Sequence, residues 1–211
     1  MASKKFDKSN KKMEILRAAA VSFAKNGIAK TKMEDIALTA GVGKGTIYEY
    51  FRSKEDIFLA AHEQLHIEID KKIKIILDYK CDPDKKLKML VDESLNIFQT
   101  KKNKTTIVTT DELAGMMMQF WSEGIREGSD KLIKPCHLKE IQRKYRKVLE
   151  GVLKDGIKQG LFKPMDTRLS ASVILAILDG IPMQRIIAPN VFGKGKIGKV
   201  ITDIIMDGIR K

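Results

Sequence analysis

The stretch "AGVGKGTIYEYF", residues 40–51, decides between the folds that are open to this chain. Three glycines at alternate positions interrupt a sequence that otherwise has helical periodicity, and two tyrosines and a phenylalanine follow them closely. Such a stretch can be a phosphate-binding loop, a dinucleotide-binding loop, or the tight corner between two short helices.

The neighbouring residues exclude both nucleotide-binding loops. A P-loop requires a glycine where Leu38 stands, and a serine or threonine for magnesium where Gly45 stands. A dinucleotide-binding loop requires a preceding strand and a third glycine at a fixed spacing. Here the preceding residues 32–40 have helical periodicity, and the third glycine is missing.

The corner between two helices fits the residues. Ile36 and Ala37 share one apolar side of the first helix, Gly41 supplies the turn, and Ile47 faces inward from the second helix. The outward positions of that very short second helix are Lys44, Thr46, Tyr48 and Tyr50. In a DNA major groove, such a helix presents its first residues to base edges while its flanks bind phosphate.

These outward residue types suit contacts with DNA. Lys44 places a positive charge at the start of the helix, and Thr46 can reach a base edge or a thymine methyl group. The tyrosine hydroxyls can donate to phosphate oxygens, and the lack of a side chain at Gly45 permits close approach to the DNA backbone. Lys54 adds its charge to the N-terminus of the following helix, which also favours phosphate.

Composition agrees with a polyanionic partner. The chain has 211 residues, of which 43% are hydrophobic, so it can bury a sizeable core. Its net charge is +13, and residues 1–54 hold 12 basic against 5 acidic residues. The apolar run around 171–178 is too short to cross a bilayer, and no signal-peptide cleavage site follows the apolar residues near the start. We therefore expect a cytoplasmic protein without a membrane partner.

Local signals predict an all-α fold. Gly27 is expected to end a first helix over residues 11–26 in the left-handed conformation. Thr31 with Glu34, and Ser53 with Asp56, are expected to cap the starts of two later helices. Further helices are expected from Pro83 and over residues 105–126, 137–159, 168–186 and 196–210.

Residues 31–58, "TKMEDIALTAGVGKGTIYEYFRSKEDIF", resemble the DNA-binding signature of the TetR/AcrR family of transcriptional regulators. The resemblance implies a three-helix head over residues 1–54 and a body for effector binding and dimerisation over residues 55–211. It implies DNA contacts at the positions of Thr31, Lys44, Thr46, Tyr48, Tyr50 and Lys54. Gly43 departs from the pattern, because many members have a serine or threonine cap at this position.

The resemblance also implies a homodimer built from the last two helices. We expect the isoleucines on their apolar faces at the interface, namely Ile174, Ile177, Ile197, Ile201 and Ile204. The chain is then a repressor that a small apolar or aromatic effector releases from its operator, without catalytic residues, metal or cofactor. The expected effector residues are His62, His66, Ile69, Phe98, Met117, Phe120, Trp121 and Tyr145.

Two features of the body keep alternatives open. "HEQLH", residues 62–66, matches the zinc-protease motif H-E-x-x-H, so the histidines can line the effector site, be solvated, or bind metal. The methionines and aromatic residues of 116–121 can equally be core. A metal-dependent hydrolase and a basic protein that binds anionic membranes are the alternative functions.

Overall fold

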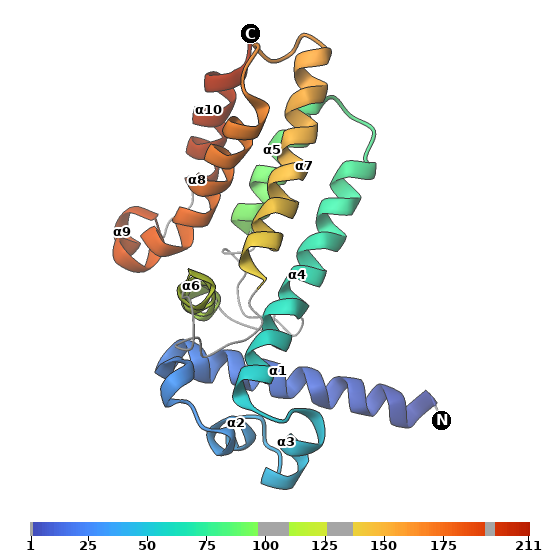
Figure 1. Cartoon of the computed structure of the whole chain (residues 1–211), viewed down its shortest axis with the longest axis vertical. Helices are drawn as coiled ribbons and strands as arrows, with labels where there is room; N and C mark the ends of the chain where they lie inside the picture. Colours follow the sequence, from blue (N-terminus) through green and yellow to red (C-terminus); the bar gives the residue numbers. More distant parts are fainter. Residues whose placement is uncertain (1, 97–109, 126–136, 193–196) are drawn as a thin grey trace. The chain divides into compact units, whose positions relative to one another are not determined.

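The computed structural model describes residues 2–96, 110–125, 137–192 and 197–211, and Figure 1 shows their arrangement as helices. The helices are α1 (Ala2–Lys30), α2 (Met33–Thr39), α3 (Lys44–Tyr50), α4 (Lys54–Asp78), α5 (Pro83–Asn96), α6 (Thr110–Ile125), α7 (Leu138–Lys158), α8 (Thr167–Ile187), α9 (Pro189–Phe192) and α10 (Ile197–Ile209). The predicted all-α class is confirmed. Helix α1 begins at Ala2, so the predicted start near Lys11 is wrong, and α9 was not predicted.

The chain packs as two compact units. The first unit comprises residues 1–68 and 100–136, which include α1, α2, α3, α6 and the beginning of α4. The second unit comprises residues 69–99 and 137–211, which include the rest of α4 and helices α5, α7, α8, α9 and α10. The division of function near residue 54 stays a prediction, since packing does not report function.

Aromatic rings form the core of the first unit. Phe23 of α1 and Phe58 of α4 meet edge to face, with ring centroids 5.4 Å apart. Phe120 of α6 stacks on Phe58 at 6.3 Å. Ile36 and Ile47 are fully buried, so α2 and α3 are each anchored by a buried apolar side chain.

The end of α1 confirms one predicted signal and corrects another. Gly27 has φ 74°, so the chain leaves the regular helix in a conformation that favours glycine. The predicted cap of α2 is wrong by one residue, because Asp35 accepts the backbone N–H of Lys32 at 3.1 Å. The Thr31 hydroxyl instead lies 2.7 Å from the Gly27 carbonyl, to which it donates.

Two other predicted helix starts are confirmed. The Ser53 hydroxyl accepts the backbone N–H of Asp56 at 3.1 Å, which caps α4. Helix α5 begins at Pro83, and the Lys86 N–H donates to the Asp82 carbonyl at 3.0 Å. Each signal operates within four residues, so it does not depend on distant parts of the chain.

Helices α5, α7, α8 and α10 enclose the core of the second unit, and Figure 1 shows α7 beside α8. Gly156 of α7 lies so close to the ring of Phe162 that a Cβ atom there would be 2.1 Å from it. The Arg210 guanidinium binds both carboxylate oxygens of Asp84 at 2.8 Å. This ion pair connects Arg210, the residue after α10, to α5.

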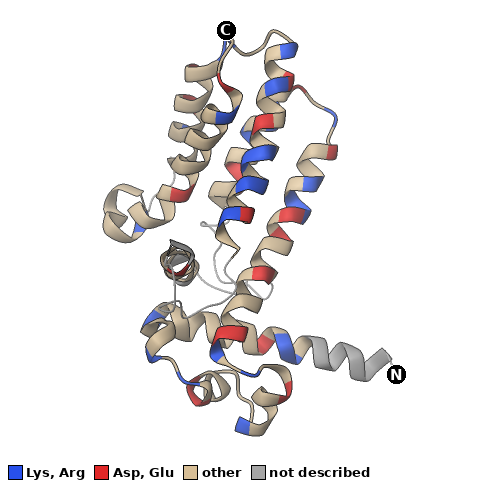
Figure 2. Cartoon of the chain, in the orientation of Figure 1, with Lys and Arg blue, Asp and Glu red and all other residues tan. Residues whose placement is uncertain are grey.

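Helix α8 has the length and apolar composition of a membrane span, and Figure 2 shows few charged residues along it. This is weak evidence, because a core helix of a globular protein can have both properties. Ala171, Ile174 and Leu178 of α8 are buried in the core of the second unit. The expected absence of a membrane partner stays a prediction.

Candidate DNA-reading face and effector site

The corner between α2 and α3 is built from buried anchors and one left-handed glycine. Gly41 has φ 65°, which allows the Val42 N–H to donate back to the Ala37 carbonyl at 3.0 Å. Ile36 and Ile47 are both fully buried, so each short helix presents its opposite side to solvent. The predicted corner is confirmed.

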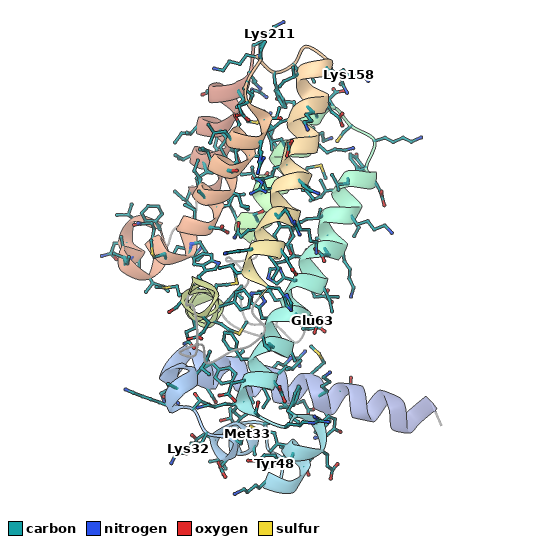
Figure 3. The ribbon with its side chains drawn as sticks, in the orientation of Figure 1. Lys32, Met33, Tyr48, Glu63, Lys158 and Lys211 are labelled. Atoms are coloured by element: carbon teal, nitrogen blue, oxygen red, sulfur yellow. The ribbon has the colours of Figure 1, made fainter. Side chains whose placement is uncertain are left out.

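The outward side of α3 carries the predicted DNA-reading residues. Lys44, Gly45 and Tyr48 are exposed, whereas Thr46 and Tyr50 are half-buried. Figure 3 labels Tyr48 on α3 and Met33 on α2. A Cβ atom at Gly45 would have no neighbour within 4 Å, so packing inside the head does not require a glycine here. An external surface that approaches closely would explain it.

Lys44 forms an ion pair with Glu34 of α2, with Nζ and Oε1 2.7 Å apart. Hydrogen bonding to Lys44 holds the pKa of Glu34 below its ordinary value, and the same bond raises the pKa of Lys44. Both groups are solvent-exposed, so the pair itself contributes little to stability. Lys44 can therefore exchange Glu34 for a phosphate at small cost.

Two residues that were predicted to contact DNA, Thr31 and Lys54, form hydrogen bonds with the end of α1. Thr31 is only 1% exposed, so its hydroxyl is not available to DNA in this arrangement. The Lys54 ammonium donates to the Ala29 carbonyl at 2.9 Å. An ammonium has three N–H groups, so Lys54 keeps donors for a phosphate as well.

The two histidines of the H-E-x-x-H motif are buried and face each other in the first unit. Their Nε2 atoms are 3.1 Å apart, and the His62 ring stacks on Phe120 with centroids 3.3 Å apart. Burial, with a smaller contribution from His66, lowers the pKa of His62 to about 2. With His62 neutral, a hydrogen bond can join the two rings, and its direction depends on the tautomers.

The geometry gives a metal-dependent hydrolase no support. Glu63, labelled on α4 in Figure 3, is exposed, whereas the histidines on either side of it in the motif are buried. A catalytic zinc needs three protein ligands. Within the described ranges, no group of three histidine, cysteine or acidic side chains is placed to hold a metal.

The remaining effector candidates are divided between the units. Met117 and Trp121 are half-buried on α6 in the first unit, whereas Ile69 and Tyr145 belong to the second. The predicted Phe98 lies outside the described residues. Whether the candidates share one site stays a prediction.

Two polar contacts of the second unit involve carboxylates, Asp179 and Asp70, that sequence reasoning missed. The Gln142 amide donates to Asp179 of α8 at 2.8 Å, and burial raises the pKa of this carboxyl. Tyr145, on the same face of α7, donates to Asp70 at 3.4 Å, and burial raises the pKa of the phenol. The signal in the sequence was a lone acid, Asp179, within the apolar α8.

The predicted interface isoleucines differ in exposure. Ile174 and Ile201 are buried in the core of their own unit, Ile177 and Ile197 are half-buried, and Ile204 is 63% exposed. Other apolar residues of α8 and α10 are also exposed, namely Leu169, Val173 and Val200. Four-residue spacing places Leu169 with Val173, and Val200 with Ile204, on one face of each helix.

Comparison with known proteins places this geometry among bacterial regulators. The family described as "Bacterial regulatory proteins, tetR family" matches residues 15–61. The fatty acid metabolism regulator protein of Bacillus subtilis is 25% identical over 203 residues, which cover 96% of this chain and 97% of that protein. The transcriptional repressor KstR2 of Rhodococcus jostii is 26% identical over 156 residues, covering 74% of this chain and 70% of that protein.

A solved structure shares the fold. The regulator FadR of Bacillus subtilis in complex with stearoyl-CoA superposes with a TM-score of 0.70 at 23% identity, covering 94% of this chain and 99% of that chain. The two aligned relatives are named as a metabolism regulator and a transcriptional repressor.

Proposed function

Because the chain is a member of the TetR family of bacterial transcriptional regulators, we propose that it is a homodimeric repressor that an apolar effector releases from its operator. The observation that carries the DNA-binding part is the exposed side of α3, held on buried Ile47 and including an exposed glycine that packing does not require. Operator DNA lies in the cytoplasm, so the protein acts there.

Gly45 allows a sharp test of the DNA-reading face. Gly45→Ala adds a methyl group into open space in a helix, so we expect a folded state more stable by about 0.5–1 kcal/mol. The same methyl group holds α3 away from DNA, so operator affinity should fall by a factor on the order of 10.

The matched control is Gly151→Ala in α7. Gly151 is exposed and its Cβ would also meet nothing within 4 Å, so the stability gain should be the same without any loss of DNA binding. A duplex chosen by selection from random sequence serves as operator, and binding is measured at fixed salt. Equal operator affinity for wild type and Gly45→Ala would remove Gly45 from the interface.

The homodimer is supported by the exposed apolar faces of α8 and α10. The exposed apolar faces of the two helices, with Leu169 and Val173 on α8 and Val200 and Ile204 on α10, cost free energy in water unless another surface covers them. Val173→Glu/Ile204→Glu should give monomers by sedimentation and abolish operator binding. Ile75→Glu, at a similarly exposed isoleucine of α4, is the control and should stay dimeric.

For the effector, a long-chain acyl-CoA is the first candidate. The support is the alignment, over nearly the whole chain, with a fatty acid metabolism regulator, together with the fold shared with a stearoyl-CoA complex. Trp121 is the only tryptophan, so its fluorescence should report binding. Palmitoyl-CoA should change this fluorescence and release the operator, whereas CoA alone should do neither.

Helix α4 is the proposed lever between the effector and the DNA. It is continuous from Lys54 in the first unit to Asp78 in the second, so a displacement of one part can reach the other. A coupling of about 1–3 kcal/mol would change operator affinity some 5- to 150-fold. An operator affinity unaffected by palmitoyl-CoA that demonstrably binds would contradict this scheme.

A further inference from the structure

The break in α1 at Gly27 leaves backbone groups that a side chain of α6 satisfies. The Gln119 amide oxygen accepts the Ile28 N–H at 3.1 Å, and its NH₂ group donates to the Phe23 carbonyl at 2.7 Å. These two groups flank the residue at which α1 leaves the helical conformation. One amide therefore fixes both sides of the break.

The same short segment also holds the starts of α2 and α4. The Thr31 hydroxyl, just before α2, donates to the Gly27 carbonyl at 2.7 Å. The Lys54 ammonium, at the start of α4, donates to the Ala29 carbonyl at 2.9 Å. Residues 23–31, which we name the α1 break, thus lead directly into α2 and are bonded to the first residue of α4.

Helix α6 fits against α1 closely enough to set the position of Gln119. Gly115, one turn before Gln119, faces Ala24, where an added Cβ atom would be 3.7 Å from the Ala24 backbone. Ala114 and Met116 are buried, so α6 cannot rotate without exposing apolar surface. A shift of α6 would instead move the amide relative to its two backbone partners.

Met117 and Trp121, two of the predicted effector residues, lie four residues apart on one face of α6. Gln119 is two residues from each, which places it on the opposite side of the helix. An effector that displaces α6 from the Met117 side therefore acts on the α1 break at the other side.

We propose that Gln119 is a positioning residue for DNA recognition, which transmits the position of α6 to the α2–α3 corner through the α1 break. The proposal rests on the proposed function in one respect, namely that α6 contributes to the effector site. Two routes then connect the effector site with the α2–α3 corner. One runs along α4, and the other passes through the two hydrogen bonds of the Gln119 side chain.

The first test uses no effector. Gln119→Leu keeps the side-chain size but removes both hydrogen bonds, so the Ile28 amide should exchange with deuterium faster and operator affinity should fall about tenfold. The matched control is Gln64→Leu in the same unit, because the Gln64 amide donates to Glu68 on the surface of α4. Urea unfolding of each variant shows that it is folded, and Gln119→Asn replaces Gln119→Leu if the latter is not.

The second test measures coupling, which a purely structural role would leave unchanged. The ratio of operator Kd with and without palmitoyl-CoA should fall at least about fivefold in Gln119→Leu, while palmitoyl-CoA binding, followed by Trp121 fluorescence, stays the same. An unchanged ratio would overturn the proposal.

An error in the proposed effector can be distinguished from an error in the role of Gln119. If wild type does not bind palmitoyl-CoA at all, the proposed effector class is wrong, and the first test decides on Gln119 alone. Wild-type operator affinity together with wild-type exchange of the Ile28 amide would then overturn the positioning role.

Discussion

Acidification should destabilise the folded protein through His62, and the structure sets the size of the effect. Burial lowers the pKa of His62 from 6.5 to about 2, since the side chain is 3% exposed and faces His66. A base whose pKa is depressed by folding binds its proton more tightly in the unfolded chain. This stability is therefore fully present above pH 6.5 and is lost progressively as the pH falls from there toward 2.

The magnitude follows from the pKa difference. Each pH unit below 6.5 costs about 1.4 kcal/mol while the folded protein leaves His62 neutral. At about pH 5 the loss is therefore on the order of 2 kcal/mol, a large share of the 5–15 kcal/mol that is typical of folded domains.

Urea unfolding followed by circular dichroism at about pH 7.5 and pH 5, at constant ionic strength, measures this loss. His62→Phe keeps an aromatic ring against Phe120 but cannot take a proton, so its free energy of unfolding should depend on pH less steeply, by about 2 kcal/mol over this interval. His137→Gln is the control, because His137 is exposed and pairs with Glu140 at the start of α7. The same pH dependence in wild type and His62→Phe would refute the burial argument.

Three further outcomes are expected. Lys44→Ala should weaken binding to all duplexes and lower the salt dependence by about one unit per subunit, whereas Glu34→Gln, which frees Lys44, should not. Gly156→Ala should destabilise by at least about 2 kcal/mol in urea unfolding, because its Cβ would lie 2.1 Å from the Phe162 ring and the buried ring cannot leave the core. Trp121→Ala should weaken the response to palmitoyl-CoA in a gel-shift titration while operator affinity without it stays within about twofold; an unchanged response would make Trp121 a core residue.

Much of the fold was predictable because the signals that start and end its helices are local. Gly27 interrupts α1 and Gly41 forms the turn between α2 and α3, each with a positive φ, and Ser53 caps α4 through a hydrogen bond to a residue three positions later. Such groups act on backbone within one helical turn, so neighbouring residues alone specify them. The outward face of α3 followed in the same way from the spacing of Ile36 and Ile47.

The failures concern burial and long-range partners, which depend on how the chain packs in space. Thr31 was predicted to cap a helix and to contact DNA. In the fold, the Thr31 side chain is buried and its hydroxyl donates to a carbonyl of the α1 break. Gln119 has no local signal, because its partners lie 91 and 96 residues away. Only tertiary packing brings such groups together.

By itself, the sequence determined the helical class, the α2–α3 corner and the residues that α3 presents, because short-range hydrogen bonds and apolar periodicity suffice for these. Tertiary structure decided which apolar residues are covered by the chain itself. Ile201 and Ile204 both belong to an apolar helix, yet one is buried in its own unit and the other is exposed. Periodicity shows that an apolar face must be covered, but the identity of the covering surface depends on how the helices pack in space.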